Sequence, residues 1–533
     1  MRSVAKRGDA VLHAVLLLTL SLCTGIAPAQ ERPAQERPPA APPSQERPPA
    51  GQAAPATAEK KTPPPEEKSS RTTRTVRIGG VDIKYTATAG TLLLKKEDGT
   101  PRASIFYIAY TRDDGGDPTR RPVTFTFNGG PGSSSVWLHL GVLGPRRVLM
   151  DEIGNPPPPP HRLVDNEYSL LDLTDLVFID PVSTGYSRPV PGEKASDFHG
   201  FKKDVESVGD FIRLYATRYQ RWTSPKFLIG ESYGTTRAAG LSGYLQERHG
   251  MYLNGIMLVS CILNFQTARF GPGNDLPYLL FLPTYAATAW YHRRLAANLQ
   301  KDLQATLREV EAFAAGEYTL ALMKGAALPA DERARIVEKL ARYTGLAADY
   351  IERADLRIEI FRFTKELLRD ERRTVGRLDS RFKGVDRDSA GENFEHDPSL
   401  SIVIGPYTAA LYDYVRGELK FESDLQYEIL HPDLWSKWSY ADFENQFVNV
   451  AETLRKAIAT NPSLKVFVAN GYYDLATPYF ATEYTFHHLG LDPSLQANLS
   501  LAYYEAGHMM YIHRPSLAKM KEDLARFIQG AMP

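Results

Sequence analysis

A serine between two glycines is the first candidate for a reactive group in this chain. Residues 230–234 read G-E-S-Y-G, so Ser232 stands at the centre of a G-x-S-x-G motif. The apolar run 227–229 precedes the motif, and a segment that can be helical, 235–246, follows it. A strand, this motif and a helix in succession are the setting of a nucleophile elbow, a tight turn that exposes the serine hydroxyl. The motif also arises by chance, so partner residues must support it.

A serine hydroxyl is a weak nucleophile, so it needs a histidine base and a carboxylate that orients this base. After an elbow, the partners follow in the order Asp, His, each on a loop after a strand. Asp474 follows the apolar run 465–469 and His508 follows the run 499–504, so both fit. Asp492 is the weaker rival for the carboxylate. The other histidines that could compete are in or beside predicted helices or precede the elbow: His139, His161, His487, His488 and His513.

A glycine-rich loop follows a predicted strand at 122–127. Residues 128–135 read N-G-G-P-G-S-S-S. This loop is either a simple turn or a device that presents bare backbone amides to a ligand. The sequence has no Cys/His cluster and no H-E-x-x-H motif, so we expect no catalytic metal and no cofactor.

Strands alternate with helices around these motifs, which predicts a mostly parallel sheet. A different pattern occupies 262–440, where helical spacing and many charges predict a helical insertion, with helices at 284–308, 330–343 and 356–371. A separate helical domain is the alternative, but the return to a sheet pattern afterwards favours an insertion. The other expected strands are 75–85, 90–95, 103–111, 175–180 and 255–261, the first three antiparallel, and the other expected helices are 198–219 and 515–528.

The N-terminal segment has the features of an export signal. A positive start, the apolar stretch 14–23 and Ala-Pro-Ala at 27–29 fit a secretory signal peptide over 1–29. The apolar stretch is too short for a stable membrane anchor. Residues 30–71 are rich in proline and low in complexity, and they predict a disordered linker. We therefore expect a periplasmic or extracellular protein, with order beginning at residue 72.

Composition narrows the classes of partner. The 533 residues carry 63 Lys+Arg and 63 Asp+Glu, so no basic excess indicates a nucleic-acid partner. The chain has two cysteines, and Cys23 would leave with the signal peptide, so Cys261 has no partner for an intramolecular disulfide. The stability of the exported protein must then come from a large core, which this length allows.

Five motifs together resemble the serine carboxypeptidase family of α/β-hydrolases. They are N-G-G-P-G-S-S at 128–134, F-I-D-P-V-S-T-G-Y-S at 178–187, G-E-S-Y-G at 230–234, N-G-Y-Y-D-L-A-T-P at 470–478 and A-G-H-M at 506–509. The resemblance implies an α/β-hydrolase fold with helices on both faces of the sheet. The core would comprise residues 72–261 and 441–533, and the insertion 262–440 would form a cap.

The resemblance also implies roles for the motif residues. Ser232, Asp474 and His508 would form a catalytic triad, and the amides of Gly130 and Tyr233 would form the oxyanion hole. The implied activity is the removal of C-terminal residues from peptides. An acyltransferase or an esterase on the same scaffold is the alternative enzyme, and a catalytically silent binding protein is the alternative outside enzymes.

A second set of residues would recognise the free C-terminus of the peptide. By the resemblance, Asn128, the amide of Gly129 and Glu231 would hold its carboxylate. An ionised Glu231 would repel that group, so we expect burial to raise its pKa and keep it protonated, with an acidic but broad pH optimum.

Two departures from the family pattern stand out. Ser133 replaces the usual cysteine after N-G-G-P-G, as in a bacterial branch without disulfides. The family also has a second glutamate downstream of the glycine loop, paired with the one before the serine. The segment 137–145 has no acid here, so the carboxylate site must differ in part.

Overall fold

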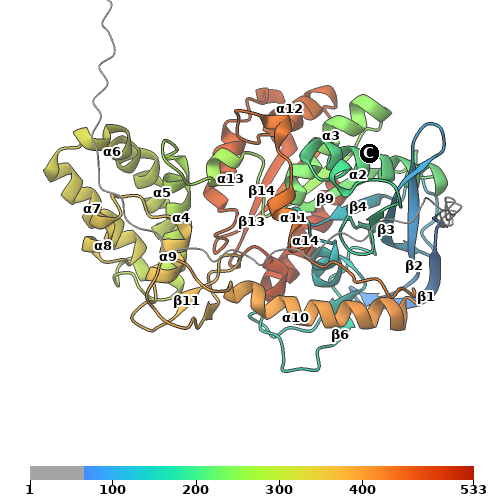
Figure 1. Cartoon of the computed structure of the whole chain (residues 1–533), viewed down its shortest axis with the longest axis horizontal. Coiled ribbons are helices and arrows are strands. Elements are labelled where there is room, and N and C mark those ends of the chain that lie inside the picture. Colours follow the sequence, from blue (N-terminus) through green and yellow to red (C-terminus); the bar gives the residue numbers. More distant parts are fainter. Residues whose placement is uncertain (1–64, 533) are drawn as a thin grey trace, which may run out of the picture. The chain divides into compact units, whose positions relative to one another are not determined.

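A ten-stranded mixed sheet forms the centre of the computed structural model, which describes residues 65–532. Its order is β1-β2-β3-β7-β4-β9-β10-β13-β14, and β8 (Arg188–Pro189) pairs with β3. Figure 1 labels β1, β2, β3, β4, β9, β13 and β14 of this sheet. The nine strands of the main path are, in this order, Ser69–Ile78, Val81–Lys95, Pro101–Arg112, Asp175–Ile179, Val123–Phe127, Lys226–Glu231, Gly255–Val259, Lys465–Gly471 and Leu499–Tyr504.

The strands from β7 to β14 on this path run parallel, and β1, β2, β3 and β7 pair antiparallel. The mostly parallel sheet is therefore confirmed. One predicted strand, 75–85, is wrong, because Gly79 and Gly80 adopt positive φ angles of 56° and 82° and make a hairpin turn between β1 and β2. Glycine pairs favour such turns, because their left-handed conformation matches the twist of the two strands.

The ordered chain begins earlier than residue 72. β1 starts at Ser69, where it pairs with Gly90 of β2, and the Glu67 carboxylate accepts a hydrogen bond from the Leu93 amide at 2.8 Å. This strand lies at the sheet edge and is largely exposed, so its sequence is polar and resembles a linker. The predicted signal peptide and residues 30–64 of the predicted linker lie outside the described residues.

Helices cover both faces of the sheet, as predicted. Alternate residues of β9 belong to two apolar clusters: Phe227 and Ile229 to one, and Leu228 to the other. α2 (Phe201–Arg218), α3 (Tyr233–His249) and α12 (Ala451–Thr460) pack in the Leu228 cluster. The other cluster contains α1 (Val136–Leu138), α10 (Pro398–Asp413) and α14 (Arg514–Gly530).

The predicted insertion has a core of its own over only part of its length. Six helices, together on one side in Figure 1, surround an apolar cluster built mainly from residues 281–375. Apolar residues within 403–429, which include part of α10, instead belong to the cluster that contains Phe227 and Ile229. The six helices are α4 (Leu276–Tyr291), α5 (Leu303–Phe313), α6 (Thr319–Lys324), α7 (Ala330–Thr344), α8 (Ala348–Arg353) and α9 (Ile360–Glu366).

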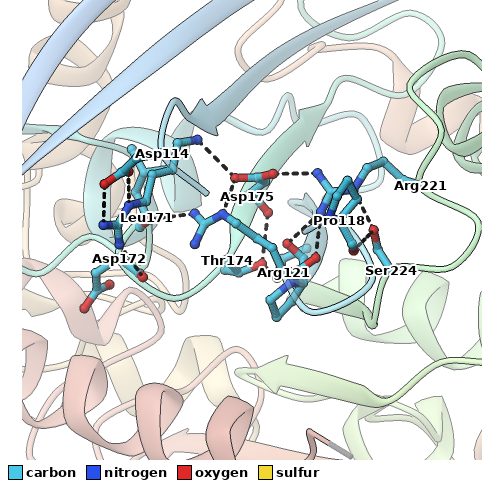
Figure 2. Close-up of polar contacts among 12 residues, drawn as sticks. Asp114, Pro118, Arg121, Leu171, Asp172, Thr174, Asp175, Arg221 and Ser224 are labelled. Atoms are coloured by element: carbon cyan, nitrogen blue, oxygen red, sulfur yellow. Dashed lines mark hydrogen bonds and ion pairs between the residues drawn. The ribbon is translucent and has the colours of Figure 1, made fainter. Parts of the chain in front are cut away.

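A buried ion network joins the N-terminal ends of the central strands. Figure 2 shows Asp175, the first residue of β7, between Arg121 and Arg221. Its carboxylate accepts hydrogen bonds from Arg121 Nε at 2.8 Å and from Arg221 at 2.5 Å. Arg221 also donates to the backbone oxygen of Pro122, immediately before β4. The network lies at the end of the sheet opposite the elbow, because β4, β7 and β9 run parallel.

Among residues 65–532, no helix is long and apolar enough to cross a membrane.

Candidate active site

Ser232 stands at a strained turn between β9 and α3. Its φ and ψ angles are 60° and −129°, a conformation that L-residues rarely adopt. The flanking glycines make the turn possible, because a Cβ at Gly230 would overlap the Gly234 carbonyl, and a Cβ at Gly234 would lie 2.9 Å from the Phe127 carbonyl oxygen. The elbow predicted from the sequence is therefore present.

Asp474 and His508 meet beside the elbow. Asp474 follows β13, His508 follows β14, and His508 Nδ1 lies 2.7 Å from Asp474 Oδ2. The carboxylate is fully buried and also accepts hydrogen bonds from the amides of Ala476 and Thr477 and from the Thr477 hydroxyl. These fixed donors hold the carboxylate so that it can orient the His508 ring.

Opposing effects set the pKa of His508. Burial lowers it, whereas the charge and hydrogen bond of Asp474, together with the charge of Glu231, raise it. The net result is a pKa above the ordinary histidine value. A histidine in this environment can accept a proton and be stabilised as a cation by the buried carboxylate.

A segment after α9 is hydrogen-bonded to the loops that carry Asp474 and His508, and no sequence motif predicted this contact. The Arg377 carbonyl accepts from the Leu475 amide at 3.1 Å, and the Leu378 carbonyl accepts from the His508 amide at 2.6 Å. The Ser380 amide donates to the Tyr473 carbonyl at 3.0 Å. We call residues 377–381 the strap.

The glycine-rich loop lies against the elbow. A Cβ at Gly129 would overlap the Tyr233 amide, and Gly130 has a φ of 103°, so both positions require glycine. The amides of Gly129, Gly130 and Tyr233 have no hydrogen-bond partner within the part of the chain that the structure describes. They are free donors next to Ser232, as an oxyanion hole or an anion site requires.

A buried arginine supports this loop from behind. Arg237 of α3 donates to the Asn128 carbonyl at 2.6 Å and to the Asp204 carboxylate at 2.7 Å. Both members of the pair are almost fully buried. Nothing in the local sequence predicted these contacts of Arg237, because Asp204 and Asn128 are both distant from it along the chain.

Asn128 and Glu231, beside the glycine-rich loop and the elbow, are both buried. The Asn128 side-chain oxygen accepts from the Leu138 amide at 3.1 Å, whereas its Nδ2 has no partner among the described residues. Burial raises the pKa of Glu231 to about 7, and the charge of Asp474 acts in the same direction, whereas the charge of His508, a hydrogen bond from Tyr511 and the nearby Asn128 amide lower it. The predicted direction of the Glu231 shift is confirmed.

Two cavities meet at Ser232. One, of about 590 Å³, also contains Asn128, Gly129, Glu231 and His508 in its wall. The other, of about 510 Å³, extends past Tyr233 towards the insertion helices. Residues that line both are Gly130, Ser232, Phe361, Arg377 and Trp435. The residues predicted for the site are thus gathered around one serine with room on each side.

The residues considered as alternatives to Asp474 and His508 have other contacts. Asp492 caps a short helix by accepting from the Ser494 amide at 2.9 Å. His139 is buried against the Tyr110 hydroxyl, and burial lowers its pKa to about 3. His487 and His488 lie at the end of α13 (Tyr479–His487). None of these four lines either cavity.

One group of side chains within the described residues is close enough to hold a cation. It consists of Asp386, Glu395 and His396. Asp386 already pairs with Lys365 at 2.5 Å, and Glu395 and His396 are exposed. The group lines neither of the two cavities, so it gives no support for a catalytic metal.

The strand order, the helices on both faces and the elbow at the end of β9 define an α/β-hydrolase fold. The chain belongs to the serine carboxypeptidase family, whose model matches residues 86–506. The family resemblance inferred from the motifs is therefore confirmed.

Individual relatives match over shorter segments. The pheromone-processing carboxypeptidase KEX1 of Saccharomyces cerevisiae is 33% identical over 156 residues, which cover 27% of this chain and 20% of the relative. Serine carboxypeptidase-like 26 of Arabidopsis thaliana is 25% identical over 178 residues, 32% of this chain and 36% of the relative. The crystal structure of yeast KEX1(Δ)p has a TM-score of 0.50 at 16% identity, over 84% of this chain and 92% of that one, which supports the fold.

Proposed function

We propose that this protein is a serine carboxypeptidase that removes C-terminal residues from peptides. The observation that carries the proposal is Asn128 Nδ2, which has no hydrogen-bond partner among residues 65–532 and is buried in the cavity wall that also contains Glu231 and Ser232. A buried donor without a partner is costly unless a ligand satisfies it. A terminal carboxylate would do so, with the Gly129 amide and a protonated Glu231 as further donors. Family membership supports the same activity.

The acylation step follows from the roles assigned to the triad. Ser232 Oγ attacks the carbonyl carbon of the last peptide bond while His508 takes the hydroxyl proton. The amides of Gly130 and Tyr233 stabilise the oxyanion that forms. The C–N bond then breaks, and His508 gives its proton to the departing amine of the C-terminal amino acid. The shortened peptide remains as an ester on Ser232.

Water completes the cycle. His508 removes a proton from a water molecule, which attacks the ester carbon, and the same two amides stabilise the second oxyanion. The C–O bond to Ser232 breaks, and the proton returns from His508 to Ser232 Oγ. The products are the shortened peptide and the free enzyme.

Matched substrates test the recognition of the free carboxylate. We expect kcat/KM to be much higher for a blocked dipeptide with a free carboxylate than for the same dipeptide amidated. Asn128→Ala should reduce kcat/KM for the free acid by about 10- to 100-fold, because a hydrogen bond to a charged group is lost. The amidated substrate serves as the control and should lose far less. Equal losses on both substrates would argue against this role of Asn128.

The alternative enzyme classes have a distinct signature. An acyltransferase would pass the acyl group to an added alcohol, and an esterase would hydrolyse esters without acting on the free-acid peptide. A silent binding protein would not react at Ser232 with a fluorophosphonate. Labelling of the wild type, but not of Ser232→Ala, is the expected result.

Export is part of the proposal. The pattern of charge, apolar residues and Ala-Pro-Ala in residues 1–29 supports cleavage after Ala29 and a location in the periplasm or outside the cell. N-terminal sequencing of the mature protein should begin at Gln30. A mature chain that retains Met1 and stays in the cytoplasm would rule this part out.

A further inference from the structure

A tyrosine far along the sequence contacts the carboxyl group of Glu231. The Tyr511 hydroxyl donates a hydrogen bond to Glu231 Oε2 at 2.7 Å. Tyr511 lies in a short helical turn three residues after His508 and is only 2% exposed. Its pKa is raised well above the ordinary value, chiefly by burial, so the phenol keeps its proton and remains a donor at any working pH.

The Tyr511 ring fills space beside the segment that lacks an acid. Gly141 lies within residues 137–145, and a Cβ at Gly141 would overlap the Tyr511 ring. The same Cβ would lie 3.0 Å from the Tyr407 hydroxyl. A glycine at this position is therefore what allows the tyrosine to reach Glu231.

We propose that Tyr511 is the positioning partner of Glu231 in place of a second carboxyl group. The Tyr511 hydroxyl donates to Oε2, so that the protonated Oε1 can donate a hydrogen bond to the terminal carboxylate of the substrate. The inference rests on the proposed function. A pair of carboxyl groups loses its shared proton as the pH rises, whereas a phenol does not titrate near neutrality. One titrating group, Glu231, then controls recognition of the free acid.

The groups around Glu231 fix the sign of the pH effect. Burial, the largest effect, and the charge of Asp474 raise the pKa of Glu231, whereas the charge of His508, the Tyr511 hydrogen bond and the nearby Asn128 amide lower it. Arg377 lines the same cavity, as does Asn128. Removing the Tyr511 hydroxyl removes a donor to the charged form, so the pKa of Glu231 should rise.

Tyr511→Phe tests the inference, because it removes the hydroxyl and keeps the ring against Gly141. We expect KM for the free-acid dipeptide to rise about tenfold, with the amidated dipeptide within about twofold. The alkaline limb of kcat/KM for the free acid should also move to higher pH. Tyr407 belongs to the same apolar cluster and feels the charge of Glu231, but within residues 65–532 its hydroxyl makes no hydrogen bond to Glu231. Tyr407→Phe should therefore change neither result.

The outcomes separate this inference from the proposed function. A wild type that does not prefer the free acid overturns both. A wild type that does prefer it, with Tyr511→Phe equally impaired on both substrates or with an unmoved alkaline limb, overturns the role of Tyr511 alone. A double variant with Glu231→Gln gives a second readout, because without a titrating carboxyl group Tyr511→Phe should no longer move the limb. A further shift in that background would also contradict the inference.

Discussion

At the scale of single residues, Glu231 and His508 titrate as a coupled pair. Each changes the pKa of the other: the charge of Glu231 raises that of His508, and the charge of His508 lowers that of Glu231. The proposed competent state has a protonated Glu231 and a neutral His508. Its net charge equals that of the state with an ionised Glu231 and a charged His508, so the pH profile belongs to the pair.

Glu231→Gln should therefore act on the base as well as on recognition. Activity rises with pH as His508 loses its proton, and removing the negative charge of Glu231 lowers the pKa of His508. The acidic limb of kcat/KM should move to lower pH, measured on the amidated substrate, which needs no carboxylate recognition. Asn128→Ala, which changes no charge, is the control and should leave this limb in place. A limb that stays fixed or moves upward in Glu231→Gln would contradict the coupling.

At the scale of elements, the strap should control the position of His508. The Asp379 carboxylate accepts a hydrogen bond from the Gly507 amide at 3.1 Å and pairs with Arg381 at 2.6 Å. Asp379→Ala leaves Arg381 buried without its partner, so we expect a loss of about 3–5 kcal/mol in the free energy of unfolding. The loop before His508 also loses its anchor, so kcat should fall by the same factor for free-acid and amidated substrates.

A substitution at an exposed ion pair, Glu371→Ala, is the control for Asp379→Ala. Glu371 pairs with Arg294 and Lys383, but its side chain is 41% exposed. Glu371→Ala should change the free energy of unfolding by less than about 1 kcal/mol. Chemical denaturation and steady-state kinetics of both variants test this role of the strap. If Asp379→Ala has the same kcat as Glu371→Ala, the strap does not control the position of His508.

Elements with strong local patterns were predictable from the sequence. The last strand, Leu499–Tyr504, has the predicted bounds, and the last helix, α14, begins one residue earlier and ends two residues later than predicted. The predicted helix 284–308 is wrong, because the chain breaks after α4, where Arg293 has a φ of 56°, and restarts at α5, which Asp302 caps. A left-handed residue without glycine gives no local signal.

Other elements of the fold and the site could not be predicted, because they depend on contacts between residues that are distant along the chain. α10 is apolar on most sides and contains Pro406, so it has no clear amphipathic pattern. The strap has no periodicity, and its bonds to the Asp474 and His508 loops join segments about 100 residues or more apart. The Tyr511–Glu231 bond spans 280 residues. Motifs predicted the groups of the site, whereas tertiary packing supplies their supports.

At the scale of the whole molecule, the Asp175 network should support the sheet without affecting the site. Asp175 and its two arginine partners have side chains no more than 10% exposed. Asp175→Ala leaves both guanidinium groups without their buried partner, so we expect a loss of about 3–5 kcal/mol in the free energy of unfolding. The kcat/KM of the folded protein should stay unchanged, since the network and Ser232 lie at opposite ends of the parallel strands. A loss below about 1 kcal/mol would show that the network contributes little.

The most direct test of the central claim is the product pattern from one defined peptide. Mass spectrometry after incubation with the mature protein should show a ladder in which single residues are lost from the C-terminus. The same peptide with an amidated C-terminus should yield the ladder much more slowly, and Ser232→Ala should yield none, because loss of the nucleophile removes several orders of magnitude in rate. Internal cleavage, loss of residues from the N-terminus, or an unchanged ladder with Ser232→Ala would contradict the assignment of a serine carboxypeptidase.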